Sequence, residues 1–277
     1  MRSTAENAEL ALLLEVASTP KPGNVDRARE YPDLLFEQFI AGAVGTRGGF
    51  EIAADGGAVG EAFERAVAGM SQQRGGNTQF GAVLLVTPLV AAASRSDLTP
   101  AAARSVVEGT TVADALDFYS AFDHVDVAVD EPPEGMDPLD VRRGGDAEPA
   151  IRDRELTLAD IMDRSADRDG VARELVEGFP RTFQTADRIQ NGDGPVTDRA
   201  AGAFLELLAD ESDTFVVTQH DRETAEEVQR RASAVLEGSE DATDLAEEFV
   251  DREINPGTTA DIVAGGLFIA LERGLDV

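Results

Sequence analysis

Residues 77–90 read Asn-Thr-Gln-Phe-Gly-Ala-Val-Leu-Leu-Val-Thr-Pro-Leu-Val, and this stretch decides the fold. Apolar side chains fall on every side of a helix built from residues 80–90, so no polar face remains to meet water. We expect Asn77 or Thr78 to cap the start of this helix, and Pro88 to kink it. The stretch therefore predicts a central helix that other helices bury on all sides.

Apolar residues recur at helical spacing through most of the remaining chain. Before the central helix, the pattern predicts helices at 5–16, 32–44 and 59–70, with Gly48-Gly49 weakening the second of them. After it, helices are expected at 101–108, 112–122, 157–165, 170–179, 182–190, 196–209, 221–236, 242–252 and 258–273. Residues 214–218 are compatible with β structure, but no set of segments alternates like several strands. We predict an all-α protein in which roughly a dozen helices surround the central one.

The segment 125–153 departs from this pattern. It contains Pro132-Pro133, Pro138, Gly144-Gly145 and many charged residues, with little helical periodicity. We interpret it as an irregular acidic excursion over the surface, because long loops of this kind are often functional. No period of about 20 to 50 residues repeats along the chain. We therefore assign residues 1–277 to a single domain.

Charge restricts the possible partners. The 277 residues include 54 Asp and Glu against 24 Lys and Arg, for a formal net charge of -30. Such a charge repels nucleic acid and anionic membranes, so we expect neither as a partner. Acid spread along the whole chain, with almost no lysine, indicates a surface adapted to high salt, where screening masks self-repulsion. We expect a cytoplasmic protein, because the N-terminus lacks signal-peptide features and the apolar run at 81–93 is too short for a bilayer.

The residue inventory also restricts the chemistry. The absence of cysteine excludes disulfides and thiolate sites, and the only histidines are His124 and His220, which argues against a zinc site. His220 precedes Asp221 and is a candidate proton donor, although a histidine at a helix start commonly has a structural role. We interpret the acidic runs 123–134 and 237–248 as solvated surface.

The first candidate motif is Glu15-Val-Ala-Ser-Thr-Pro-Lys-Pro-Gly-Asn-Val-Asp26, which contains Lys21, the only lysine of the chain. The prolines at 20 and 22 steer Thr19 and Lys21 toward extended conformations, and Gly23 then lets the backbone turn. An ammonium is a compact, movable charge suited to one phosphate oxygen, whereas Arg offers a planar fork. The motif therefore predicts a stiff loop whose amine serves a ligand. The alternative is an ordinary loop with a solvated lysine.

The second motif, Arg74-Gly-Gly-Asn-Thr-Gln79, precedes the central helix. Exposed amides at a helix N-terminus behind a flexible glycine pair favour an anion, and Arg74 adds a bidentate phosphate contact. The alternative is a tight turn with an N-cap.

The third motif, Ile254-Asn-Pro-Gly-Thr-Thr-Ala-Asp261, opens another apolar helix. We expect Asn255 as its N-cap, followed by Pro256, and Asp261 in the first or second turn, where the helix dipole favours a carboxylate. Asp261 is therefore a candidate for holding Mg²⁺ or polarising a hydroxyl, unless the motif is only a capped helix.

Together the three motifs resemble the triphosphoribosyl-dephospho-coenzyme A synthase family, which makes the prosthetic-group precursor of citrate lyase and malonate decarboxylase. The resemblance runs from near residue 7 to near residue 272 and is densest in Glu15…Thr19-Pro-Lys-Pro-Gly23…Asp26, Gly76-Asn-Thr78 and Pro256-Gly257…Ala260-Asp261. It departs at Gln79-Phe80, where the family usually has His-Lys, so a basic contact is lost. The family's Asp-Thr-Asn segment looks like Asp213-Thr214-Phe215 here, and its Arg-Gly-Glu-Ala segment corresponds loosely to residues 143–148.

The resemblance implies an all-α enzyme that transfers the triphosphoribosyl group of ATP to the 2′-hydroxyl of 3′-dephospho-coenzyme A and releases adenine. It implies Mg²⁺ held by two or more of Glu15, Asp26 and Asp261, with one of these carboxylates as general base. Lys21 is the expected triphosphate ligand and completes the catalytic set. The ATP-binding residues implied are Thr19, Lys21, Gly23, Arg74, Gly76, Asn77, Thr78, Asn255, Gly257 and Thr258.

Three other functions stay open at this point. A transferase of the same fold acting on another acceptor, such as a pterin-type precursor, suits the departure at Gln79-Phe80, and a hydrolase would cleave the N-glycosidic bond with water. A non-catalytic helical binding protein would keep the fold alone. The sequence does not indicate an oligomeric state.

Overall fold

The computed structural model describes residues 2–132 and 135–277, and in these residues the chain forms fifteen α-helices, three short 3-10 helices and no strand. The all-α prediction is confirmed. The helices of the first half are α1 (Thr4–Ala17), α2 (Phe36–Ala54), α3 (Val59–Met70), α4 (Phe80–Arg95), α5 (Pro100–Glu108), α6 (Val112–Ser120) and α7 (Glu148–Asp153). Those of the second half are α8 (Leu158–Ser165), α9 (Gly170–Glu177), α10 (Pro180–Asn191), α11 (Val196–Asp210), α12 (Thr214–Gln219), α13 (Arg222–Leu236), α14 (Ala242–Asp251) and α15 (Gly257–Glu272). The 3-10 helices are η1 (Ala121–Asp123), η2 (Asp137–Leu139) and η3 (Val141–Ala147).

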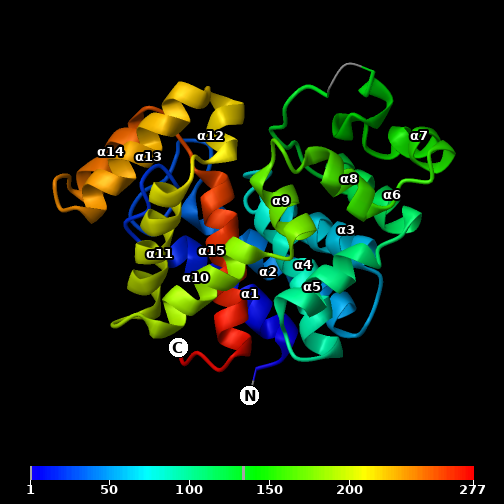
Figure 1. Cartoon of the computed structure of the whole chain (residues 1–277), viewed down its shortest axis with the longest axis horizontal. Coiled ribbons are helices and arrows are strands. Elements are labelled where there is room, and N and C mark those ends of the chain that lie inside the picture. The colour runs from blue at the N-terminus through cyan, green and yellow to red at the C-terminus, as the bar shows by residue number, and fades with distance from the viewer. Residues whose placement is uncertain (1, 133–134) are drawn as a thin grey trace.

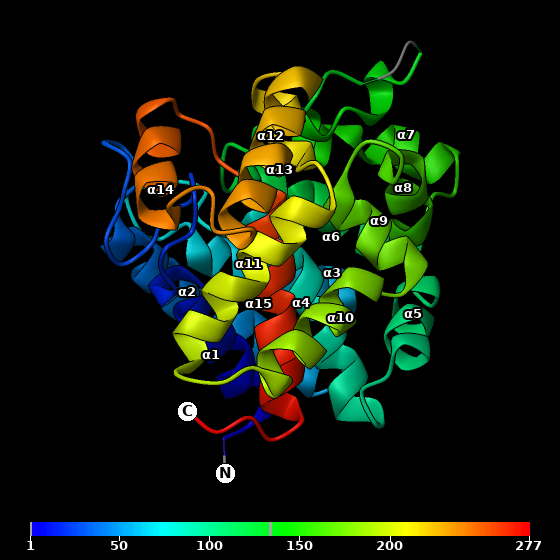
Figure 2. The ribbon, with the colours of Figure 1, turned by 60° about the vertical axis from the view of Figure 1, so that its left-hand side comes forward.

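Two helices form the centre of the molecule. All residues of α4 from 82 to 92 are buried, as the sequence predicted for this helix. Helix α15 is buried in the same way from 258 to 271, with Asp261 as the one exception. The two helices pack against each other, and α1 and α10 cover other sides of α15. Figure 1 shows α15 in red between α10, α11, α13 and α14 on one side and α3 to α8 on the other, and Figure 2 shows α4 behind it.

Close contacts between small residues hold α2 against α3. A Cβ on Gly45 would lie 2.2 Å from the carbonyl oxygen of Gly69, and a Cβ on Gly49 would lie 2.3 Å from that of Ala62. The two backbones therefore approach to a distance that only glycine permits. This packing explains why α2 continues through Gly48-Gly49 to Ala54, whereas the sequence predicted a helix ending at residue 44 and weakened by that pair.

The N-caps of the two central helices differ from those predicted. Helix α4 begins at Phe80, and Asn77 Oδ1 accepts a hydrogen bond from the Phe80 amide at 3.0 Å. Pro88 lies inside α4 without ending it. Asn255 was expected to cap α15, but its N-cap is Pro256, because the Asn255 side chain is engaged by a loop from the N-terminal part of the chain.

The segment 125–153 is more ordered than predicted. It contains η2, η3 and α7, and the Asp123 carboxylate anchors it by accepting a hydrogen bond from the Gly145 amide at 3.1 Å. Gly144, with φ of 51°, passes so close to Asp123 that a Cβ would collide with the carboxylate. Pro133 and Glu134 of this segment lie outside the described residues. The assignment of the whole chain to one domain stays a prediction.

Within the described residues, no single helix has both the length and the hydropathy of a membrane span. Helices α4 and α5 reach those limits only when taken together, and they are bent by 109° at their junction.

Candidate active site

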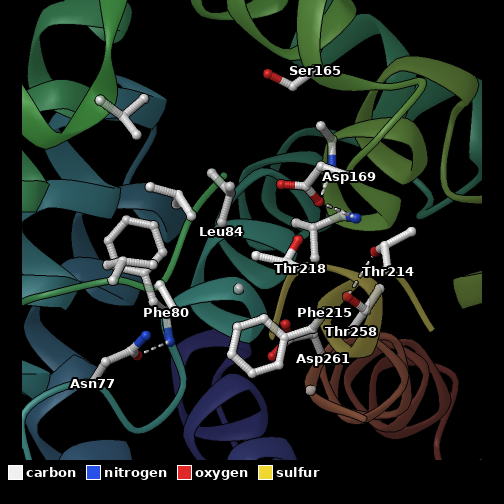
Figure 3. Close-up of a pocket in the computed structure, with 18 of the residues that line it drawn as sticks. Asn77, Phe80, Leu84, Ser165, Asp169, Thr214, Phe215, Thr218, Thr258 and Asp261 are labelled. Carbon is white, nitrogen blue, oxygen red and sulfur yellow. Dashed lines mark hydrogen bonds between the residues drawn. The ribbon is translucent and has the colours of Figure 1, made fainter. Parts of the chain in front are cut away.

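A cavity of about 470 Å³ opens beside the N-terminal ends of α4 and α15. Further parts of the described wall come from α1, α6, α8, α9 and α12, from the loop that carries Asn24, and from the segments 126–132 and 136–141. Figure 3 shows that side chains from α4, α12 and α15 converge on this space, together with Asp169, the residue before α9. The two central helices, α4 and α15, therefore both begin at this cavity.

Asp261 is the carboxylate that α15 brings to this point. Its carboxylate lies against Gly81 of α4, where a Cβ would come within 2.0 Å of Oδ2. The Ala82 amide donates a hydrogen bond to the same carboxylate. The N-terminal end of α4, which the sequence predicted as an anion site, is therefore occupied by a carboxyl group of the chain itself.

The electrostatic surroundings of Asp261 oppose its ionisation. Burial raises its pKa well above the ordinary value, and the charges of Glu15, Asp213 and Asp169 raise it further. The hydrogen bond from Ala82 acts in the other direction but is weaker. A carboxyl group with a raised pKa in the wall of a cavity is typical of a residue that moves protons.

Lys21 is completely buried, so the alternative of a solvated lysine is wrong. Its ammonium donates hydrogen bonds to Glu15 Oε1 and, at 2.8 Å, to Asn24 Oδ1. Glu15 and Asn24 line the cavity, whereas Lys21 lies behind them and does not. The expected contact between this amine and a phosphate is therefore not available in this conformation. Burial raises the pKa of Glu15, and the charge of Lys21 opposes that rise.

Asp26 organises its own loop. Its carboxylate accepts hydrogen bonds from the amides of Lys21, Ala28 and Arg29 at 3.2, 2.7 and 2.9 Å, and the residue is 1% exposed. It does not line the cavity. Asp26 therefore does not share a ligand position with Glu15 and Asp261, and the described residues contain no group of three or more His, Cys, Asp or Glu placed to hold a metal ion.

The first and third motifs are joined directly. Asn24 Nδ2 donates a hydrogen bond to Asn255 Oδ1 at 2.9 Å, and both side chains line the cavity. Gly23 has a φ of 78° and lies so close to the chain that a Cβ would come within 2.1 Å of the Ile254 carbonyl oxygen. Glycine is required here for both the conformation and the contact.

Asp213 ties the start of α12 to the start of α15. Its Oδ1 accepts from the Phe215 and Val216 amides at 2.8 and 3.1 Å, and its Oδ2 accepts from the Thr259 amide and hydroxyl, both at 2.7 Å. As an N-cap, it makes residues 214–219 helical, and the β-compatible interpretation of 214–218 is wrong. Figure 3 shows the adjacent hydroxyl pair, Thr214 and Thr258, whose oxygens are 3.0 Å apart.

Seven of the thirteen predicted site residues line the cavity, and six do not. The lining residues are Glu15, Asn77, Thr78, Asn255, Gly257, Thr258 and Asp261. The others are Thr19, Lys21, Gly23, Asp26, Arg74 and Gly76. Arg74 and Gly76 are exposed on the turn before α4, away from the described wall.

The sequence did not single out several residues of the described wall. Asn24, Asp169, Arg164 and Arg168 line the cavity, as do Phe residues of α4, α6 and α12. The Asp169-Gly170 pair carries an N-cap signal, since Asp169 accepts from the Val171 and Ala172 amides, but that signal is common to many helices. Neither histidine is part of the described wall: His220 contacts the Glu253 carbonyl oxygen at 3.1 Å, and His124 contacts Glu64 at 2.5 Å.

The Gln79-Phe80 departure has a structural explanation. Gln79 is buried and donates a hydrogen bond to the Leu12 carbonyl oxygen at 3.2 Å, which ties α4 to α1. Phe80 joins an aromatic cluster, with its ring 5.1 Å from Phe63 and 4.8 Å from Phe122. These two positions therefore contribute packing and an apolar wall.

The chain is similar to a solved structure and matches a family model. A crystal structure from Archaeoglobus fulgidus, described provisionally as a triphosphoribosyl-dephospho-CoA synthase, has a TM-score of 0.70 and 26% sequence identity, over 85% of this chain and 99% of that chain. No curated protein sequence matches the chain. The family model for ATP:dephospho-CoA triphosphoribosyl transferase (CitG) matches residues 1–276. The chain therefore belongs to the ATP:dephospho-CoA triphosphoribosyl transferase family.

Proposed function

We propose that the cavity beside α4 and α15 is the active site in which the triphosphoribosyl group of ATP passes to the 2′-hydroxyl of 3′-dephospho-CoA, with release of adenine. Membership of the family gives the reaction class, a transfer from ATP to dephospho-CoA. The observation that carries the assignment to this cavity is the position of Asp261. It is the one cavity-facing carboxylate set into an otherwise buried central helix, and it meets the start of the other central helix.

The transfer is a displacement at the anomeric carbon of the ribose, with oxocarbenium character. The bond from C1′ to adenine breaks and the departing base takes up one proton, while the bond from the acceptor oxygen to C1′ forms and the acceptor hydroxyl gives up one proton. We assign that proton to Asp261, because its raised pKa makes the carboxylate a stronger base than an ordinary Asp. Its negative charge also stabilises the positive charge that develops on the ribose.

Neighbouring side chains would orient the sugar. The amides of Asn24 and Asn255 are held by their mutual hydrogen bond, and the hydroxyls of Thr214 and Thr258 are held by theirs. Asn77, Thr78 and Gly257 stay candidates for contacts with ribose or phosphate oxygens, since all three line the cavity. Lys21 would act as a positioning residue that fixes Glu15 and Asn24 from behind.

Mg²⁺ fits this wall only as an ion shared with the substrate. The described residues offer no three-carboxylate cage, but Mg²⁺ commonly takes one or two protein carboxylates together with phosphate oxygens and water. Glu15 would be a protein ligand, because Asp261 is assigned to the proton transfer. Glu15 can serve because Lys21 engages its Oε1, while no described donor bonds its Oε2. When bound, the ion would neutralise part of the negative charge that the nucleotide brings to this acidic wall.

We also infer a cytoplasmic protein adapted to high salt from the net charge of -30. The surface supports this with networks in which one arginine serves several carboxylates. Arg231 contacts Glu227, Glu240 and Glu248, and Arg252 contacts Glu227 and Glu248.

The test is incubation of the protein with ATP and Mg²⁺ in high salt, with and without dephospho-CoA, followed by mass spectrometry. We expect adenine and the triphosphoribosyl adduct in equal amounts, and neither without the acceptor. Adenine released without dephospho-CoA would indicate a hydrolase, and adenine that appears only with a pterin-type precursor would indicate another acceptor. A melting temperature that no nucleotide raises would indicate a non-catalytic protein, because a true binding site stabilises by mass action.

A further inference from the structure

Negative charge dominates the described wall of the cavity, which includes Glu15, Asp126, Asp130, Glu131, Asp140, Asp169 and Asp261. A nucleotide with a polyphosphate group must nevertheless enter it. Only two cationic side chains belong to this described wall, Arg164 and Arg168. Lys21 is buried behind Glu15, and the start of α4 already holds the Asp261 carboxylate. The wall therefore leaves the two arginines as its cationic contacts for phosphate.

The two arginines come from one short stretch of chain. Arg164 lies in the last turn of α8, and Arg168 follows in the turn that leads to α9. The amides of Arg168 and Asp169 both donate to the Ser165 carbonyl oxygen at 2.9 Å, which fixes this turn. The backbone thus presents both side chains from a defined position on the wall.

Neither arginine forms an ion pair with a carboxylate of the described residues. Nearby arginines form ion pairs, namely Arg142, Arg152 and Arg173. Among the described residues, no ion pair includes Arg164 or Arg168, although carboxylates outnumber basic residues 54 to 24 in the chain. Both side chains are exposed, so their guanidinium groups are available to a ligand in the cavity.

Residues 164–168, which carry both arginines and form the arginine segment, include Ser165, the one residue of this segment that Figure 3 labels. Figure 3 shows Ser165, which lies between the two arginines in sequence, at the end away from Asn77 and Asp261. A 5′-polyphosphate nucleotide has a similar layout, because its phosphates and its base are attached to opposite ends of the ribose. Phosphates at the arginine segment would therefore direct the anomeric carbon toward Asp261.

On these grounds, and resting on the proposed function, we propose that Arg164 and Arg168 form the phosphate subsite of the cavity. Their ligand is the polyphosphate chain on the 5′-carbon of a nucleotide. Two substrates of this reaction carry such a chain, the triphosphate of ATP and the diphosphate of dephospho-CoA. A guanidinium binds phosphate oxygens through two parallel N–H donors, which gives orientation as well as affinity.

The test is the double variant Arg164→Gln/Arg168→Gln, compared with Arg222→Gln/Arg230→Gln. The control removes the same two charges from α13, away from the cavity, and so reproduces any loss of long-range attraction. Binding of ATP with Mg²⁺ and of dephospho-CoA is measured separately by calorimetry, at moderate and at high salt. We expect affinity to fall by about 10- to 100-fold for each phosphate contact that is lost, in the cavity variant only. Arg164→Lys/Arg168→Lys should recover part of the loss, because it restores charge without the planar fork.

Each outcome decides a separate point. Weaker binding of ATP alone assigns the subsite to the donor, and weaker binding of dephospho-CoA alone assigns it to the acceptor. Equal affinities in the wild type and the cavity variant, with an unchanged melting temperature, overturn the subsite and leave the proposed function intact. A wild-type protein that binds neither nucleotide overturns the proposed function itself.

Discussion

Lys21→Met removes the only lysine amine of the chain and keeps the length of the side chain. The amine donates to Glu15 and to Asn24, which are 3% and 5% exposed. The variant therefore leaves a buried carboxylate without its cation. Removing one partner of a buried ion pair costs about 3–5 kcal/mol. With an unfolding entropy of about 2.1 cal/mol/K per residue over 277 residues, the melting temperature should fall by about 5–9 °C.

The assay is thermal unfolding at fixed salt, together with ATP binding by calorimetry. Adding Glu15→Gln to Lys21→Met removes the uncompensated charge, so the double variant should recover stability, with a coupling energy above about 1 kcal/mol. Arg104→Met is the control, because it breaks an exposed pair with Glu108 and should change stability by less than about 0.5 kcal/mol. The positioning role would be refuted if Lys21→Met kept the wild-type melting temperature but lost ATP affinity, since that is the behaviour of an amine that contacts phosphate.

Two further predictions concern Asp261. Gly81→Ala places a Cβ within 2.0 Å of Asp261 Oδ2 and should abolish most turnover by displacing the carboxylate. The control is Gly202→Ala in α11, where a Cβ meets nothing within 4 Å, so this variant should keep activity and add about 1 kcal/mol of stability. Equal activity of the two variants would contradict the assignment of Asp261. Because the folded-state pKa of Asp261 is raised from 3.8, the folded state binds more protons, so wild-type stability should fall relative to Asp261→Asn as pH rises through the raised pKa. Melting temperatures of both proteins between pH 3 and 8 test this. Parallel curves of melting temperature against pH would show that folding does not raise the pKa of Asp261.

The sequence predicted the parts of the fold that depend on apolar periodicity. Helix α4 has no polar face, and burial on all sides is the only stable placement for such a helix. Helix ends were predicted less well, because they depend on contacts that are distant in sequence. The hydrogen bond of Asn24 with Asn255 illustrates this. It engages the side-chain oxygen of Asn255, the residue expected to cap α15.

The site was predicted in part for a related reason. Residue type and motif identified Asp261 and Glu15, which do line the cavity. Motif alone could not separate Glu15 from Asp26, which lie at the two ends of the same loop. The Asp26 carboxylate accepts hydrogen bonds from amides of its own loop, whereas the Glu15 carboxylate accepts one from the Lys21 ammonium and lines the cavity. Such local hydrogen bonding has no signature in a single sequence, and neither does the burial of a lysine.

The most direct measurement is a single turnover of Asp261→Asn with ATP, Mg²⁺ and dephospho-CoA, alongside ATP binding to the same variant. Asn keeps the size of the side chain and an acceptor for the Ala82 amide, but it cannot take a proton. We predict that the variant binds ATP within a few-fold of the wild type and releases adenine at least about 100-fold more slowly, the range that a general base contributes. Adenine release at the wild-type rate, with the adduct formed, would contradict the placement of the chemistry at Asp261.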